Sequence, residues 1–204
     1  IHEFIVEYLM NQLLIHDADI SCCNYLRFGD NSCDFCDDTK EEVACLSNVE
    51  ACEKMMGDSA FLVPAWAKII KKEIVVDNPF PVGRIQEDEA TIHKFFYAAS
   101  KVVVSNKKMY GYYVNSDGIM QSKQNMEKNI NDFIWALEMR EQFFKEKKEK
   151  SLVLLTEINK IRMIVHGLSL KCIPDKKDKK KVLIKALIKK NNKKTAFFSS
   201  FFQK

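Results

Sequence analysis

The stretch Val82-Gly83-Arg84-Ile85-Gln86-Glu87-Asp88-Glu89-Ala90 organises this chain of 204 residues. Apolar residues at helical spacing follow it, so we predict that its three carboxylates, Glu87, Asp88 and Glu89, lie in or just before the first turn of a helix. An ionised carboxylate held in position can accept a proton, which makes the triplet a candidate general base. Acidic residues are also common in first turns for stability alone, at about 0.3–1 kcal/mol each, and by itself the triplet favours this simpler interpretation.

This stretch belongs to one of four motifs that follow one another in a fixed order. Ala65–Glu73 contains a tryptophan and spaced lysines, Phe80–Glu89 joins Phe-Pro to the carboxylates, Lys107–Tyr113 is rich in tyrosine, and Ser116–Met120 follows a turn. Together the four motifs resemble the second half of family-2 glycosyltransferases, which are inverting enzymes of the GT-A fold. Four motifs in the right order are far more specific than any one of them.

The resemblance implies a fold class and a reaction. The fold would be α/β, a partial GT-A (nucleotide-diphospho-sugar transferase) fold with a C-terminal helical extension. In the family, a nucleotide-binding half with a metal-binding Asp-x-Asp motif precedes these motifs. The sequence Ile1-His2-Glu3-Phe4 resembles the residues that follow the Asp-x-Asp motif. We therefore expect a fragment that does not transfer sugar alone. The complete enzyme would be hexosyltransferase-like and act in polysaccharide or cell-envelope synthesis.

The resemblance also implies roles for individual residues. Asp88 would be the general base that deprotonates the acceptor hydroxyl, and Glu87 would orient Asp88 or the acceptor. The acceptor-binding residues that it implies are Trp66, Lys68, Glu89 and Tyr113. Without the resemblance, Trp66 is a core aromatic, Lys68 a solvated lysine and the strand tyrosines half-buried packing residues.

The expected partners follow from the same resemblance. They are a nucleotide-sugar donor and a saccharide or lipid-linked acceptor. A divalent metal, Mn or Mg, would stabilise the charge on the leaving phosphate, with its ligands outside this chain. Cys33-Asp34-Phe35-Cys36 is a lone CxxC without a second ligand pair, so we interpret it as reduced thiols in a loop and not as a metal site.

Charge divides the chain unevenly. Residues 174–204 carry eleven lysines and two aspartates, a net of +9, which leaves −5 for the first 173 residues because the whole chain totals +4. The acidic body does not indicate a nucleic-acid partner. We predict three parts: residues 1–121 as the second half of a glycosyltransferase domain, 122–173 as a helical extension, and 174–204 as a basic amphipathic tail.

The basic tail has two interpretations. Lysines beside phenylalanines could place a helix on an anionic membrane surface, or the tail could be solvated with its phenylalanines against the body. No run of about 18 apolar residues predicts a membrane span. We expect a cytoplasmic location, and under the first interpretation the tail would bring the chain to the inner face of the plasma membrane. The rival function is a non-catalytic module that binds a membrane or a partner.

Periodicity predicts the remaining elements. An amphipathic helix ends near His16-Asp17, and a strand follows at 18–25. A capping box at 47–50 opens a helix that ends near Met56-Gly57, and Pro64 fits a first helical position. Short strands are expected at 101–105 and 109–114.

Two long helices should form an antiparallel pair on the body. The apolar stripe predicted for the first consists of Met126, Ile130, Phe133, Leu137 and Phe144. The stripe predicted for the second consists of Leu154, Ile158, Ile161, Val165 and Leu168.

Overall fold

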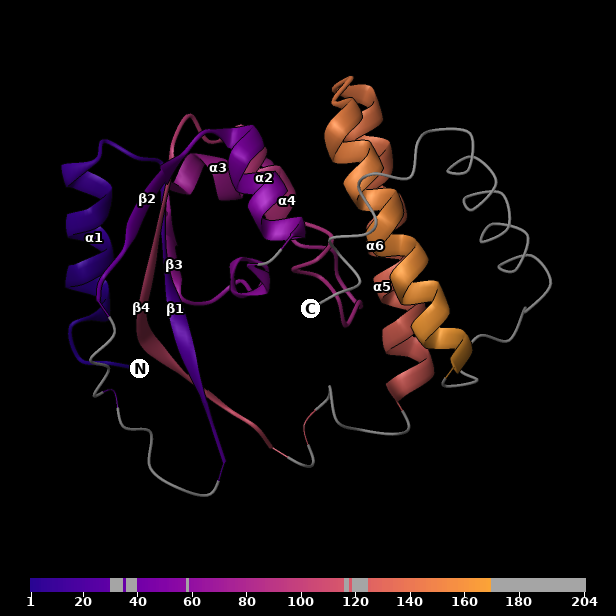
Figure 1. The fold of residues 1–204 in the computed structure, drawn as a ribbon, viewed down its shortest axis with the longest axis horizontal. Helices are drawn as coiled ribbons and strands as arrows, with labels where there is room; N and C mark the ends of the chain where they lie inside the picture. Colours follow the sequence, from indigo (N-terminus) through magenta and orange to yellow (C-terminus); the bar gives the residue numbers. More distant parts are fainter. Residues whose placement is uncertain (30–34, 36–39, 58, 116–117, 119–124, 170–204) are drawn as a thin grey trace.

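The computed structural model describes residues 1–29, 35, 40–57, 59–115, 118 and 125–169. Over these residues the chain forms a layered α/β fold around a sheet (Figure 1). Helix α1 (Ile5–Ile15) covers one face of the sheet, and helices α2 (Asn48–Met56) and α4 (Ile92–Ala98) cover the other. The predicted α/β class is confirmed at this level.

The described strands form one mixed sheet in the order β2-β4-β1-β3. The central strands β1 (Ile20–Phe28) and β4 (Val102–Tyr113) run parallel. The edge strands β2 (Val43–Leu46) and β3 (Lys68–Ile70) are antiparallel to their neighbours. Strand β1 confirms the predicted strand. The two short strands expected between 101 and 114 are one continuous strand, β4, because its pairing with β1 resumes after an irregularity and extends from Val102 to Tyr113.

Helix α1 packs through one stripe onto the sheet. Ile5, Leu9 and Leu13 are buried, at the spacing of four expected for a helix face. The helix ends where predicted, with His16 as C-cap and Asp17 in the left-handed region at φ 47°. Ile1 and Phe4 have the same helical spacing in the sequence, but they precede the helix and are exposed.

The larger core lies between the sheet and helices α2 and α4. Ile20 and Val102 of the sheet pack there with Phe95 and Phe96 of α4, and all four side chains are fully buried. The predicted capping box of α2 is confirmed: Ser47 accepts a hydrogen bond from the Glu50 backbone N–H, and the Glu50 carboxylate accepts one from the Ser47 N–H at 2.8 Å.

The tryptophan segment does not begin a helix, and the prediction for Pro64 is wrong. A short 3₁₀ turn, η1 (Ala60–Leu62), precedes an irregular stretch that leads into β3. Ala67 has φ 59°, outside the helical region, and its carbonyl accepts a hydrogen bond from the Cys23 N–H of β1. Pairing with the sheet therefore overrides the local helical preference. A short helix, α3 (Lys72–Asp77), follows.

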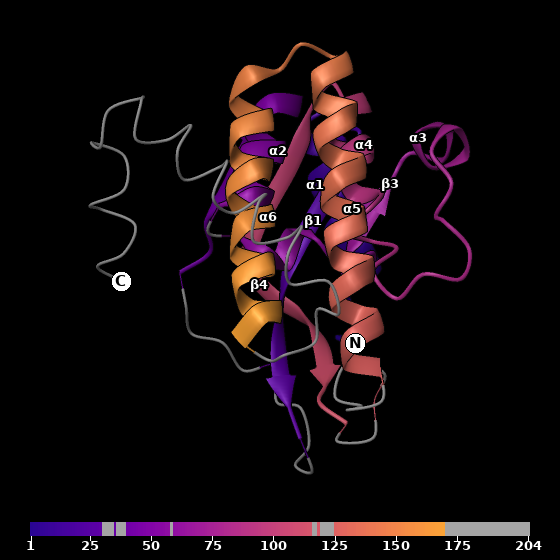
Figure 2. The same cartoon turned by 90° about the vertical axis from the view of Figure 1, so that its right-hand side faces the viewer.

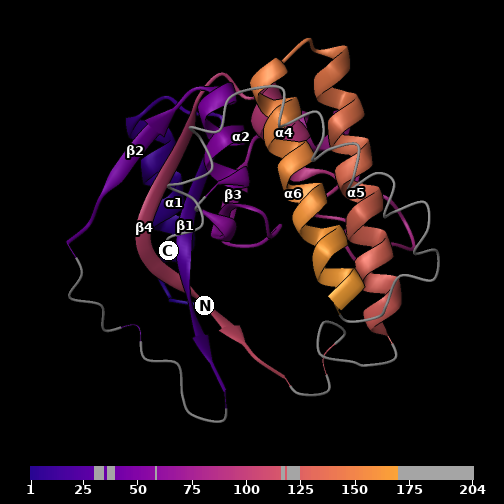
Figure 3. The ribbon, with the colours of Figure 1, turned by 45° about the vertical axis from the view of Figure 1, so that its right-hand side comes forward.

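Helices α5 (Met126–Glu146) and α6 (Lys150–Ser169) lie side by side as an antiparallel pair (Figures 2 and 3). The pair packs against the outer side of α2 and α4, as predicted. Ile130, Leu137 and Phe144 of the predicted α5 stripe are buried.

The stripe predicted for α6 is wrong at two positions, Leu154 and Val165. Leu154 is 56% exposed and Val165 48% exposed, whereas Leu152, Thr156 and Ile164 are buried. Helix α6 is apolar on several sides, so more than one face fits a helical period. The buried face tolerates Thr156 because its hydroxyl donates to the Leu152 carbonyl oxygen at 2.8 Å.

Several predictions fall on residues outside the described ranges. They concern the CxxC sequence, the Ser116–Met120 motif apart from Gly118, and the basic tail at 174–204. Within the described part of the chain, no helix combines the length and the apolar character that crossing a membrane requires.

Candidate functional site

The predicted carboxylates lie in a turn directly before α4, as expected. The Asp88 carbonyl oxygen accepts hydrogen bonds from the N–H groups of Thr91 (3.0 Å) and Ile92 (2.9 Å), which starts the helix. The Asp88 side chain turns back on the same loop, where its Oδ1 accepts a hydrogen bond from the Glu89 N–H at 2.8 Å. The backbone of the turn therefore fixes the position of the Asp88 carboxylate.

Asp88 is a stronger base than an ordinary aspartate. Burial raises its pKa to about 6, and the charges of Glu89 and Glu87 also raise it, while the hydrogen bond from the Glu89 N–H lowers it. A carboxylate with a pKa near 6 is mostly ionised at pH 7 and still takes up a proton readily. This combination suits a general base at neutral pH.

Lys68 of β3 lies within electrostatic range of Asp88. Burial lowers the pKa of Lys68, and the nearby Asp88 carboxylate acts in the opposite direction. The ammonium group donates hydrogen bonds to the backbone carbonyl oxygens of Pro64 and Trp66, at 3.1 Å for Trp66. The ammonium group of Lys68 is therefore held by the tryptophan segment, and it interacts with Asp88 through charge alone.

Trp66 belongs to a cluster of aromatic rings on the sheet. Its indole stacks on Tyr110, with centroids 4.4 Å apart and planes 14° apart, and on Tyr112 at 5.5 Å and 19°. Tyr25 meets it edge-on at 5.0 Å. All four residues are half-buried, so the cluster combines packing with accessible aromatic surface.

Tyr113, the tyrosine that the resemblance implies for acceptor binding, lies outside the aromatic cluster around Trp66, and its role stays a prediction. It is 51% exposed at the end of β4, and its ring lies against Phe28 with centroids 5.4 Å apart. The tyrosines that contact Trp66 are Tyr110 and Tyr112 instead. Their spacing of two along a strand was the signal available in the sequence, because alternate residues share a face.

Glu89 faces helix α5. A single nitrogen of Arg140, Nη2, donates to the Glu89 carboxylate and, at 2.7 Å, to the Glu89 backbone carbonyl oxygen. The Arg140 side chain is 2% exposed and that of Glu89 12%. The predicted acceptor-binding carboxylate therefore has a buried cationic partner, which braces the residue next to Asp88.

A second set of contacts braces the other side of the acidic turn. Asp132 of α5 accepts hydrogen bonds from Arg84 Nη1 at 2.8 Å and from the Ile85 N–H at 3.0 Å. Lys128 donates to the same carboxylate at 2.9 Å. The Arg84 guanidinium also lies 4.3 Å from the centre of the Trp135 ring. Helix α5 therefore holds residues 84–89 at both ends.

The electrostatics of Asp132 agree with this bracing role. Burial opposes ionisation, but the hydrogen bonds from Ile85, Arg84 and Lys128 more than offset it and lower the pKa of Asp132 to about 2. Sequence reasoning missed Asp132 and Arg140. The sequence offered a signal for Arg140. It lies three residues after Leu137 and four before Phe144, so a charged residue occupies a position on the apolar face of the helix.

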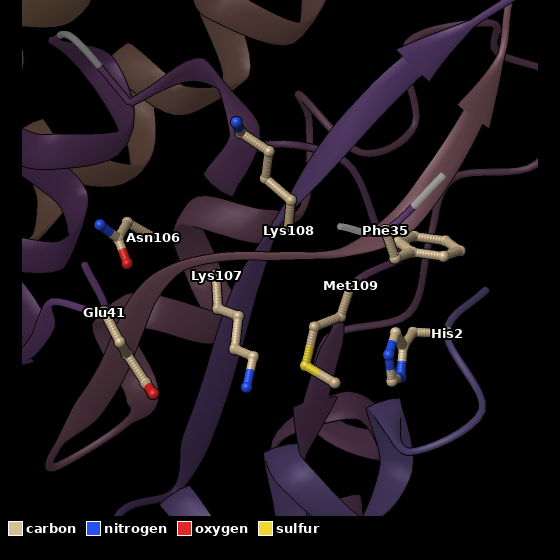
Figure 4. Close-up of a pocket in the computed structure, with 7 residues that line it drawn as sticks. All are labelled: His2, Phe35, Glu41, Asn106, Lys107, Lys108 and Met109. Atoms are coloured by element: carbon tan, nitrogen blue, oxygen red, sulfur yellow. The ribbon is translucent and has the colours of Figure 1, made fainter. Parts of the chain in front are cut away.

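A separate hollow lies near the start of α1 (Figure 4). Lys107 and Met109 project from one side of β4 into this region, and Lys108 projects from the other (Figure 4). The residues that line it are His2, Phe35, Glu41, Asn106, Lys107, Lys108 and Met109. It includes none of the predicted site residues, so it is distinct from the acidic turn.

The described part of the chain contains no set of side chains that could bind a metal ion. Among these residues, no group of three His, Cys, Asp or Glu side chains could hold a metal ion. Cys22, Cys23, Cys45 and Cys52 are free thiols. The divalent metal with ligands outside this chain stays a prediction.

The mixed sheet and its covering helices are compatible with an α/β glycosyltransferase-like fold, and the chain has a glycosyltransferase homologue. Over 154 residues it is 32% identical to Glycosyltransferase GlyG of Streptococcus pneumoniae, a match that covers 72% of this chain and 48% of GlyG. The chain thus spans about half the length of this curated relative. No protein-family model matches the chain.

Proposed function

We propose that this chain supplies the acceptor side of an inverting glycosyltransferase of family 2 and the GT-A fold, with Asp88 as the general base. Asp88 would take the proton of an acceptor hydroxyl while the hydroxyl oxygen attacks the anomeric carbon of a nucleotide-diphospho-sugar. The bond to the diphosphate breaks on the opposite face of the sugar, which inverts the anomeric centre. A hexose is the proposed sugar, and a saccharide or a lipid-linked sugar the proposed acceptor.

The observation that carries the proposal is the environment of Asp88. Burial raises the pKa of this carboxylate to about 6, and the backbone and helix α5 brace the turn that holds it. A positioned general base contributes about 10²–10⁴-fold to a rate, and most effectively when its pKa lies near the working pH. The glycosyltransferase relationship supplies the class of reaction.

The remaining predicted residues take supporting roles in this proposal. Lys68 would stabilise the ionised form of Asp88 and lie near the acceptor, and Glu87 would orient Asp88 or the incoming hydroxyl. The half-buried ring of Trp66 could stack on the apolar face of a sugar. Because Arg140 already binds the Glu89 carboxylate, Glu89 would act by holding the turn more than by touching the acceptor.

The test is the transfer activity of the Asp88→Asn variant in the complete gene product that carries these residues. The assay measures transfer of labelled sugar from a panel of nucleotide sugars to acceptors in extracts of the producing cells. This transfer should fall by two orders of magnitude or more in Asp88→Asn, while donor binding persists. Asp77→Asn, the same change at the exposed end of α3, is the matched control and should keep full activity. Near-normal transfer by Asp88→Asn would overturn the assignment of the base.

A further inference from the structure

A cavity of about 310 Å³ lies between the end of α2, the η1 turn and the α5–α6 pair. This volume is within the range of sites that hold small organic molecules. Glu89 and Arg140 form part of its wall, so it adjoins the braced turn beside Asp88. It is a separate feature from the hollow near α1 and from the aromatic cluster around Trp66.

The wall of this cavity is divided between apolar and cationic side chains. Its apolar lining includes Met55, Phe133, Leu137 and Met163, of which Met55 and Leu137 are almost completely buried. Methionine side chains adapt to ligands of irregular shape because they are unbranched and polarizable. An apolar group of a ligand would therefore find a complementary surface on this side.

The polar part of the wall carries more positive than negative charge. Arg140 and Arg162 contribute two guanidinium groups, and Glu89 contributes one carboxylate. Arg140 is almost completely buried, and its Nε has no hydrogen-bond partner among the described residues. A buried donor without a partner is costly, and a ligand oxygen that entered the wall beside Arg140 would relieve this cost.

We propose that this cavity binds an amphipathic anion, with an apolar chain against the methionines and a phosphate group against Arg140 and Arg162. Guanidinium groups suit a phosphate because their donors form a planar fork that matches its oxygens. The basic segment at 174–204, with a net charge of +9, is a poor candidate for the same place because its charge repels the arginines. The proposal does not depend on sugar transfer.

The experiment uses the whole chain with [¹³C]methyl-labelled methionine and short phosphate probes. Octyl phosphate, kept below its micelle concentration, should shift the methyl signals of Met55 and Met163 in a saturable way and raise the melting temperature. Inorganic phosphate and glucose 1-phosphate lack the alkyl chain and should bind at least about tenfold more weakly. Octylammonium, which has the chain with the opposite charge, should leave these signals unchanged.

Two variants test the two halves of the cavity separately. Arg162→Gln, at an exposed position of α6, should weaken octyl phosphate binding by about tenfold through the loss of a charge-assisted contact. Lys150→Gln on the same helix is its control and should bind normally. Ala60→Trp places a bulky side chain at an exposed wall position and should block binding with both arginines intact. Equal binding of octylammonium, unchanged methionine signals, or normal binding by both cavity variants would overturn the proposal.

Discussion

Arg140 of helix α5 donates hydrogen bonds to both the backbone carbonyl oxygen and the carboxylate of Glu89, the residue next to Asp88. The pair joins positions 51 residues apart, and both side chains are largely buried. The Arg140–Glu89 ion pair matters because it connects helix α5 to the turn that carries the proposed base, Asp88. The segment beyond residue 122 thus supports the acidic turn directly.

Arg140→Met should strongly destabilise the chain. The substitution leaves the Glu89 carboxylate buried without its cation, and breaking such a pair costs about 3–5 kcal/mol. Glu89→Gln in the same background removes the unpaired charge and should recover a large part of this loss. Urea unfolding of the two single variants and the double variant measures the coupling. If the losses of the single variants simply add in the double variant, the two residues are not coupled.

Asp88→Asn should stabilise the chain at pH 7. The pKa of Asp88 is about 6 in the folded state against 3.8 for the free side chain, so ionisation opposes folding as the pH rises from about 4 to about 6. Two pKa units correspond to about 3 kcal/mol, and partial exposure reduces the expected gain to roughly 1–2 kcal/mol.

The comparison of pH 4 with pH 7 isolates this effect. At pH 4 the folded wild type already carries a protonated Asp88, so Asp88→Asn and the wild type should unfold at nearly the same urea concentration. At pH 7 the variant should be the more stable of the two, and Asp77→Asn should show no such gain. A variant that is equally stable or less stable at pH 7 would contradict the burial of an ionised Asp88.

Asp132 should contribute stability with the opposite pH dependence. Its folded pKa of about 2 lies below the free value of 3.8, so its contribution is present above pH 4 and is lost as the pH falls from about 4 to 2. Asp132→Asn should cost about 1–2 kcal/mol at pH 7, since Arg84 and Lys128 are partly exposed to water.

Urea unfolding between pH 2 and pH 7 measures the Asp132 contribution. The gap between wild type and Asp132→Asn should close toward pH 2. Lys128→Met removes one exposed partner alone and should cost less than about 1 kcal/mol. A gap that stays constant down to pH 2 would mean that Asp132 acts through packing and not through its charge.

The sequence predicted those features that depend on local periodicity and capping. Helix α1, strand β1 and the Ser47 capping box follow from patterns within a few residues, and so does the turn at Glu87–Glu89. The long helices were also predictable, because an apolar period sustained over 20 residues is a strong signal.

The features that depend on distant partners could not be predicted in the same way. Lys68 lies in a strand because β1 pairs with it, and nothing between Pro64 and Lys68 indicates that pairing. The contacts of Arg140 and Asp132 with the acidic turn span 47 to 51 residues. The buried face of α6 is decided by its fit against α2 and α5, since several of its faces are apolar.

Ser47→Ala should lower the free energy of unfolding by about 1 kcal/mol. The substitution removes the side-chain acceptor of the Glu50 N–H and thereby half of the capping box. Ser151→Ala, at an exposed position of α6, is the matched control and should change the stability by less than about 0.5 kcal/mol. Equal urea midpoints for the two variants would show that the cap contributes little.

The central claim is that Asp88 is a carboxylate whose burial prepares it to accept a proton near neutral pH. A titration of the side-chain carboxyl ¹³C signals by NMR measures this on the chain itself, with Asp88→Asn identifying the Asp88 signal. The structure predicts that this signal titrates with a pKa of about 6. A pKa near the ordinary value of 3.8 would show an exposed carboxylate without special basicity, and the proposed role of Asp88 would lose its physical support.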